Sequence, residues 1–213
     1  DFTMVGGGVT RNRAVKVNNT DGTVDATWNP DCNDRVRSIE TDGTYIYLGG
    51  DFTTVGGTTR NKVAKVNNIN GVVDASWDPD CSGYSGDRVY SIAIDGSDIY
   101  LGGSFTGIGG TTKKYAAKVN NTNGAVDISW DFAYDSVVYS IAVVGTNIVA
   151  AGYFSQIGTQ RTGAAKVNNT DGSVDASWNP DCNDYVRSIV VNGTDIYLGG
   201  GFTTVGETSR GRA

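Results

Sequence analysis

Short runs of apolar and β-branched residues recur along this chain, and glycine-containing turns separate them. No run keeps the 3.6-residue apolar period of a helix for long enough to form one, because glycine interrupts every candidate. The pattern therefore predicts strands. The first predicted strand covers residues 35–40, 88–94, 137–143 and 185–191; the second covers 45–50, 98–103, 147–152 and 195–200.

A third predicted strand, at residues 62–67 and its copies, is followed by a fourth that ends at a tryptophan. Asp-Gly and Asn-Gly pairs lie between the strands, as at 42–43 and 70–71. These pairs favour type I′ hairpin turns, whose central residues need positive φ. A Gly/Thr-rich stretch between the second and third strands, such as 53–60, is expected to be a loop. Each unit is therefore two hairpins or one four-stranded antiparallel sheet.

The same sequence unit occurs four times along the chain. Its tryptophans are Trp28, Trp77, Trp130 and Trp178, which places them 48–53 residues apart. A four-stranded unit of about 50 residues is typical of a β-propeller blade, and blades must pack on one another to bury their faces. The predicted fold is all-β, a β-propeller of four-stranded antiparallel blades. A β-solenoid is the alternative, although its repeats are usually shorter and lack internal hairpins.

The repeats divide the chain 1–213 into units at roughly 1–50, 51–103, 104–152 and 153–200, with a partial repeat at 201–213. Both ends fall within the motif, so two arrangements are open. The last two strands could pair with the first two and close a four-bladed ring. Alternatively, the chain is a segment of a larger protein, or several chains share blades. We favour the second arrangement.

Composition narrows the possible functions. Among 213 residues there are 30 glycines and no histidine, which excludes histidine-based triads, histidine general bases and histidine-ligated metals. The net charge of −6 argues against a nucleic-acid partner. No apolar stretch reaches 18 residues, so we expect no membrane insertion.

The three cysteines, Cys32, Cys81 and Cys182, each follow a tryptophan by four residues. Equivalent positions on neighbouring blades lie too far apart for a disulfide, so we expect small buried side chains. An intermolecular bridge is the alternative.

Two kinds of aspartate are candidate site residues. Calcium is a possible cofactor at the turn phrase 18–25 and its copy, where oxygen-bearing side chains recur. We favour a plain hairpin turn there, with Asp25 paired to Lys16, and expect no cofactor. The weak calcium candidates are Asp21, Asp25, Asp171 and Asp175.

The loop after each tryptophan is the candidate ligand-binding face, because the second repeat carries an insertion there and insertions often mark a binding face. A plain connector is the alternative. The candidate residues are Asp31, Asp34, Tyr84, Asp181 and Asp184.

Catalysis is not expected, because every carboxylate in question repeats and a catalytic site is normally unique in a chain. The tryptophans and tyrosines could stack on sugars, one set per blade, but packing between blades explains their fixed positions better.

The strand–turn layout resembles kelch repeats. The phrases Gly-Gly-Asp-Phe-Thr-Thr-Val-Gly-Gly at 49–57 and Gly-Val-Val-Asp-Ala-Ser-Trp-Asp-Pro at 71–79 more closely resemble the delta-60 repeat β-propellers of large secreted or surface proteins of bacteria. The resemblance implies a propeller in an extracellular context and no assigned chemistry. We therefore expect a non-enzymatic structural or adhesive propeller, acting by protein contact or self-assembly at the cell surface. A carbohydrate-binding propeller with one weak site per blade is the alternative.

Overall fold

The computed structural model describes residues 2–5, 9–81, 86–131, 133–206 and 208–209. Within these ranges every regular element is a β-strand, and all pairings are antiparallel. The described chain accordingly contains no helix that could cross a membrane. The predicted all-β fold is confirmed.

Three central units each form a three-stranded sheet, in which the chain passes from first to second to third strand. The sheets are β3 (Val36–Thr41), β4 (Tyr45–Gly50) and β7 (Val63–Asn67); β8 (Val89–Asp95), β9 (Asp98–Gly103) and β12 (Ala116–Asn120); and β13 (Val138–Val144), β14 (Asn147–Gly152) and β17 (Ala164–Asn168). The second strands have the predicted bounds, and the first strands begin one residue later than predicted. We call these sheets blades one, two and three.

Part of a blade lies at each end of the chain. The C-terminal half-blade is the hairpin of β18 (Val186–Asn192) and β19 (Asp195–Gly200), which corresponds to the first two strands of a blade. The N-terminal half-blade is the segment 14–28, which corresponds to the third strand and the outer segment.

The Gly/Thr stretches expected to be loops instead contain short hairpins, whose strands are each two residues long. These are β1 (Met4–Val5) with β2 (Val9–Thr10), β5 (Thr54–Val55) with β6 (Thr58–Thr59), β10 (Gly107–Ile108) with β11 (Thr111–Thr112), β15 (Gln156–Ile157) with β16 (Thr159–Gln160), and β20 (Thr204–Val205) with β21 (Thr208–Ser209). A bridge from the post-tryptophan loop joins several of them, as between Cys32 and Val55.

The expected fourth strand is reduced to one bridging residue in each unit, for example Val73 opposite Val66. The reason is the aspartate that follows. The Asp74 carboxylate accepts hydrogen bonds from the backbone nitrogen of Ser76 at 3.0 Å and from its hydroxyl at 2.6 Å. An aspartate that captures a backbone N–H two residues ahead turns the chain and ends the ladder. The fourth segment therefore packs against the blade without extending its sheet.

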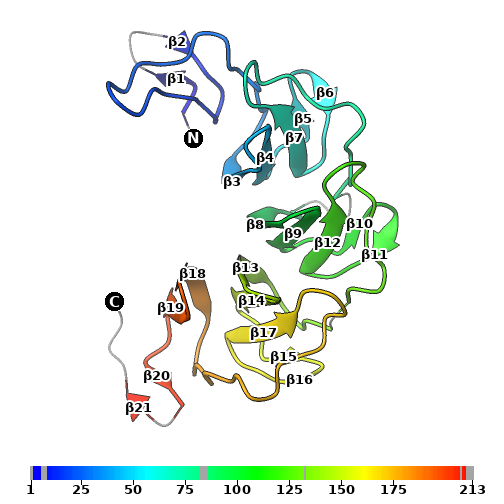
Figure 1. Cartoon of the computed structure of the whole chain (residues 1–213), viewed down its shortest axis with the longest axis vertical. Coiled ribbons are helices and arrows are strands. Elements are labelled where there is room, and N and C mark those ends of the chain that lie inside the picture. Colours follow the sequence, from blue (N-terminus) through cyan, green and yellow to red (C-terminus); the bar gives the residue numbers. More distant parts are fainter. Residues whose placement is uncertain (1, 6–8, 82–85, 132, 207, 210–213) are drawn as a thin grey trace.

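The blades follow one another along an open arc, with first strands on the inner side and outer segments on the outer side (Figure 1). The two half-blades form the ends of this arc and do not pair with each other in the described structure. The four-bladed ring closure that the sequence left open is therefore not formed here.

The hydrophobic core lies between blades. Tyr47 of blade one meets Trp77 edge-on, with ring centroids 5.4 Å apart, and both are fully buried together with Val89 and Ile92 of blade two. Gly49 allows this contact, because a Cβ there would lie 2.7 Å from Val89. Blades two and three repeat the arrangement with Tyr100 and Trp130. Trp77 and Trp130 therefore pack between blades, as predicted, whereas Trp178 is only half-buried.

Candidate interaction surfaces

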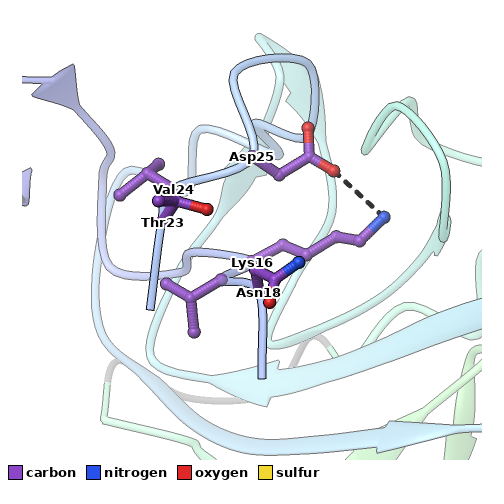
Figure 2. A pocket seen from close by; sticks show the side chains of 6 residues that line it. Lys16, Asn18, Thr23, Val24 and Asp25 are labelled. Atoms are coloured by element: carbon purple, nitrogen blue, oxygen red, sulfur yellow. Dashed lines mark ion pairs between the residues drawn. The ribbon is translucent and has the colours of Figure 1, made fainter. Parts of the chain in front are cut away.

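The turn aspartates of the N-terminal half-blade are held by their own turn. Lys16 and Asp25 form an ion pair of 3.1 Å beside an open cavity of about 240 Å³ that Val17, Thr23 and other turn residues line (Figure 2). Hydrogen bonds from the Thr27 hydroxyl and backbone, with the Lys16 ammonium, hold the Asp25 pKa far below its usual range. The predicted pairing of Asp25 with Lys16 is confirmed.

Asp175 repeats this geometry, with Lys166 at 3.1 Å. Asp21 and Asp171 instead accept hydrogen bonds from Thr23 and Ser173, which lower the pKa of each carboxyl. In the described ranges, no three Cys, Asp or Glu side chains are grouped closely enough to hold a metal ion. The four calcium candidates thus have a structural role in their turns, and the expectation that they hold no cofactor stays a prediction.

The post-tryptophan aspartates shape their loops. Asp31 and Asp181 have positive φ, 50° and 48°, and the Asp31 carboxylate accepts a hydrogen bond from the Asn12 amide. Asp34 and Asp184 each accept a hydrogen bond of 2.7 Å from the next backbone nitrogen.

These loops precede β3 and β18, at opposite ends of the arc, so the structure does not bring the four aspartates together (Figure 1). Tyr84 lies outside the described residues.

All three cysteines are buried free thiols. Burial raises the pKa of Cys32 to about 12 and that of Cys182 to about 11. Deprotonation is therefore suppressed, and with it nucleophilic reactivity and intermolecular disulfide formation. The expectation of small buried side chains is confirmed.

One surface was missed from the sequence. At the second position of the four first strands, Arg37, Tyr90, Tyr139 and Arg187 form what we call the inner-strand row. The Arg37 guanidinium lies 5.2 Å from the centre of the Tyr90 ring, and the Arg187 guanidinium lies 5.4 Å from that of Tyr139. The two tyrosine rings meet edge-on at 5.5 Å. The row joins all first strands by aromatic and cation–π contacts.

One end of the row carries an ion-pair cluster of one aspartate and two arginines. The Asp51 carboxylate accepts two hydrogen bonds from the Arg37 guanidinium, of 2.5 Å from Nε and 2.7 Å from Nη2. The Nε atom of Arg88 lies 3.4 Å from the same carboxylate. Burial would raise the Asp51 pKa, but hydrogen bonding and attraction to these arginines lower it overall. The sequence did contain a signal for the inner-strand row. The second position of the first strand is arginine in two repeats and tyrosine in the other two, whereas the valine before it and the serine after it recur in all four.

Apolar side chains that are buried in complete blades are exposed in the half-blades. Val17 is 50% exposed whereas its counterpart Val66 is fully buried, and Tyr197 is 56% exposed whereas Tyr47 is fully buried. The two ends of the arc therefore each present an incompletely covered apolar face.

Comparison with a family described as "Domain of unknown function (DUF5122) beta-propeller" gives matches at residues 41–76 and 147–177. Each match runs from the second strand to the outer segment of a blade. These repeats are thus similar to those of a β-propeller family. The comparison with curated proteins gives no match.

Two solved structures share the fold. The computationally designed Ika4 protein is 11% identical, with 85% of this chain and 94% of that chain covered and a TM-score of 0.57. The extracellular domain of the putative hybrid two component system BT4673 from B. thetaiotaomicron is 14% identical, with a TM-score of 0.52. There 93% of this chain but only 26% of that chain is covered, so this chain spans about a quarter of that structure.

Proposed function

We propose that this chain is a non-enzymatic, extracellular β-propeller of the delta-60 repeat kind, which acts as a structural or adhesive module through protein contact, self-association included. The observation that carries the proposal is the exposure of large apolar side chains on complete blades, where Ile69, Val72 and Ile128 are 69%, 62% and 72% exposed. Exposed apolar faces of this kind mark sites of protein interaction.

Two further points support an extracellular, non-catalytic module. One solved relative in fold is itself described as an extracellular domain. In addition, the carboxylates at Asp25, Asp74 and Asp175 are each committed to a turn and a lysine.

A specific observation favours carbohydrate binding as the second candidate. Tyr90, Tyr139 and Tyr185 present rings at the inner side of the arc, and Tyr153 beside them is 61% exposed. Aromatic rings stack on sugar faces, and arginines of the inner-strand row would bind acidic groups.

Surface labelling and a glycan array together test the proposal. We expect an antibody to label the protein on intact cells of its source, and we expect the 213-residue chain to bind no glycan on the array. If the chain binds a glycan and Tyr139→Ala abolishes that binding, the carbohydrate-binding function would be favoured over protein contact. Retention of the protein inside the cells would exclude the extracellular module altogether.

A further inference from the structure

We infer that the protein partner binds at one end of the inner strands, on a surface that includes the inner-strand row, and that the segment it binds is an acidic polypeptide. The inference rests on the proposed function of protein contact and names the chemistry of the partner. It depends on positions at which the repeats differ, because positions that recur in every repeat serve the shared fold.

Each first strand carries a β-bulge at the row. In blade one, Val36 pairs with Gly50, and Ser38 pairs with Gly49. Arg37, between them, is the extra residue of the bulge. The same register shift occurs in β8, β13 and β18, where the extra residues are Tyr90, Tyr139 and Arg187. Bulges re-aim a side chain and are frequent beside active sites. The backbone itself therefore directs the row residues out of the regular strand pattern.

Three variable positions of each repeat meet at this end of the blade, on the inner side of the arc (Figure 1). In blade one they are Arg35, Arg37 and Asp51, and the backbone N–H of Asp51 donates to the Arg35 carbonyl oxygen at 2.8 Å. The same bond recurs in the other three repeats, at 2.9–3.0 Å. We call these three residues, with their counterparts in the other repeats, the inner rim. The valine, serine, glycine and phenylalanine around them recur in all four repeats.

The inner rim differs from the rest of the chain in composition. Of its twelve positions, four hold arginine, four hold tyrosine and one, Asp51, is acidic, whereas the whole chain has a net charge of −6. Tyrosine and arginine are enriched at the centres of protein interfaces. Opposite charge steers an acidic partner towards a patch of this kind.

The aspartates that precede the rim do not cancel this charge by pairing with it through their bonded oxygens. They are Asp34, Asp87 and Asp184, and each carboxylate accepts a hydrogen bond from a backbone nitrogen, at 2.7–3.3 Å. The side chains of Arg35 and Arg187 are exposed. The groups that a ligand would meet at the rim therefore include guanidiniums.

Asp51 organises the cationic part of the rim. Its carboxylate binds Arg37 of its own blade and lies near Arg88 of the next blade. Burial raises the pKa of this carboxyl, but the surrounding arginines, Arg35 included, lower it overall. One carboxylate thus faces three guanidiniums and leaves an excess of positive charge. Arg37 uses Nε and Nη2 for this pair, so its Nη1 group is the one that a ligand would meet. Side chains that are already held lose less freedom when a partner binds.

The aromatic part of the rim holds a guanidinium without an aspartate from its own blade. Where Arg37 has Asp51, Arg187 has Gly201. A Cβ on Gly201 would lie 2.5 Å from the Tyr185 ring, so the glycine makes room for that ring. Tyr185 lies 6.4 Å from Tyr139, over which the Arg187 guanidinium is placed. A guanidinium stacked on a ring keeps its N–H donors for a carboxylate, which it binds bidentately.

The arrangement of the rings favours a polypeptide over a glycan. Sugar rings need an open aromatic face, but Arg37 lies over the Tyr90 ring and Arg187 lies over the Tyr139 ring. These two tyrosine rings also meet at 66°, so they do not form one flat platform for successive sugar units. Separate carboxylates on the flexible side chains of a peptide can reach separate guanidiniums without stacking.

Fluorescence polarisation on the 213-residue chain tests the inference with labelled poly-L-glutamate as the probe. Polygalacturonate serves as the comparison, because it carries the same carboxylates on a sugar backbone. We expect poly-L-glutamate to bind at low ionic strength, to bind more weakly as salt is added, and to bind more tightly than polygalacturonate. Absence of binding to poly-L-glutamate at low ionic strength, or tighter binding of polygalacturonate, would overturn the inference.

Arg187→Gln tests whether the rim is the binding surface. The side chain is exposed, so the fold should be retained, and we expect poly-L-glutamate to bind about tenfold more weakly because a charge-assisted hydrogen bond is lost. Lys114→Gln is the matched control, since it removes one positive charge from an exposed side chain outside the rim. Equal losses in both variants would assign the binding to overall charge, and unchanged affinity in Arg187→Gln would exclude the rim.

Tyr153→Ala tests the aromatic contact. Tyr153 belongs to the rim, lies 6.2 Å from Tyr185 and is 61% exposed, so its loss should leave the circular dichroism spectrum unchanged. We expect poly-L-glutamate to bind about fivefold more weakly. Unchanged affinity would show a simple anion site without the contact area that a polypeptide covers, and would contradict the inference.

The proposed function is judged by a different result. A chain that labels the cell surface, binds no glycan and also does not bind poly-L-glutamate would keep the proposed function and lose this inference. A chain that binds poly-L-glutamate through Arg187 but stays inside the cells would keep the binding surface and lose the extracellular module.

Discussion

The indole nitrogen of Trp77 donates a hydrogen bond to the backbone carbonyl oxygen of Asn120, with 2.8 Å between the two atoms. Trp77 belongs to the outer segment of blade one, and Asn120 ends the third strand of blade two. One bond therefore ties consecutive blades at their outer side, while the same indole ring packs on Tyr47 between them.

Replacing Trp77 by phenylalanine tests the contribution of this bond. We expect Trp77→Phe to lower the free energy of unfolding by about 1–3 kcal/mol or more, because a partly buried carbonyl loses its donor and a large ring is truncated. Urea unfolding in dilute solution measures the change. Trp178→Phe is the control, since its indole makes no such bond in the described chain, and an equal loss in both variants would contradict this explanation.

Glycine at the blade junction is the subject of a second prediction. In Gly102→Ala the new Cβ would lie 2.8 Å from Val138 and 3.0 Å from Ile141. We expect a loss of roughly 1–3 kcal/mol in the free energy of unfolding, typical of an overpacked core. In dilute monomer Gly199→Ala should unfold like the wild type. Similar melting temperatures for Gly102→Ala and wild type would argue against tight contact at this junction.

Acid should weaken the turns that the aspartates close. Hydrogen bonds from Ser177, with the Lys166 ammonium, lower the pKa of Asp175 to about 2, below the value of about 3.9 in an unfolded chain. A lowered folded-state pKa stabilises the fold above pH 4 and loses this effect as the pH falls towards 2. We expect the melting temperature to fall over that range and to fall less steeply in Asp175→Asn. Parallel pH profiles would show that Asp175 does not contribute.

The thiols should be unreactive until the blades open. Burial raises the thiol pKa of Cys32 to about 12, and Cys81 and Cys182 are shifted in the same direction. We expect a thiol reagent to label none of the three in native buffer and all three in denaturant. Val17→Cys serves as the positive control because Val17 is exposed. Rapid native labelling of Cys81 would show that the junction between blades one and two opens readily.

The strands could be located from the sequence because each is bounded by turn residues with a strong conformational preference. Gly43 and Gly71, for example, adopt φ of 90° and 75°, which glycine tolerates best. The fourth strand was overestimated because the apolar pattern of Val73 and Trp77 says nothing of the competing Asp74 side chain. The Lys16–Asp25 pair was predictable because it joins two segments separated by only one hairpin.

The inner-strand row could not be predicted in the same way. Tyr90 and Tyr139 are 49 residues apart, and only the packing of neighbouring blades brings their rings to 5.5 Å. The same holds for Trp77 and Asn120. Contacts between repeats depend on the angle at which blades stack, which local strand and turn preferences do not determine.

Local sequence is enough to define the repeating unit of this protein: strands bounded by glycine turns, and aspartate turns closed by their own hydrogen bonds. These features depend on neighbours within about 20 residues. Packing in three dimensions places the units along an open arc, brings the arginines and tyrosines of the inner-strand row together, and leaves Tyr197 and Val17 uncovered. The reason is that a side chain at a blade junction is buried only when a neighbouring blade packs on it, and the residues around it in the sequence are the same in both cases.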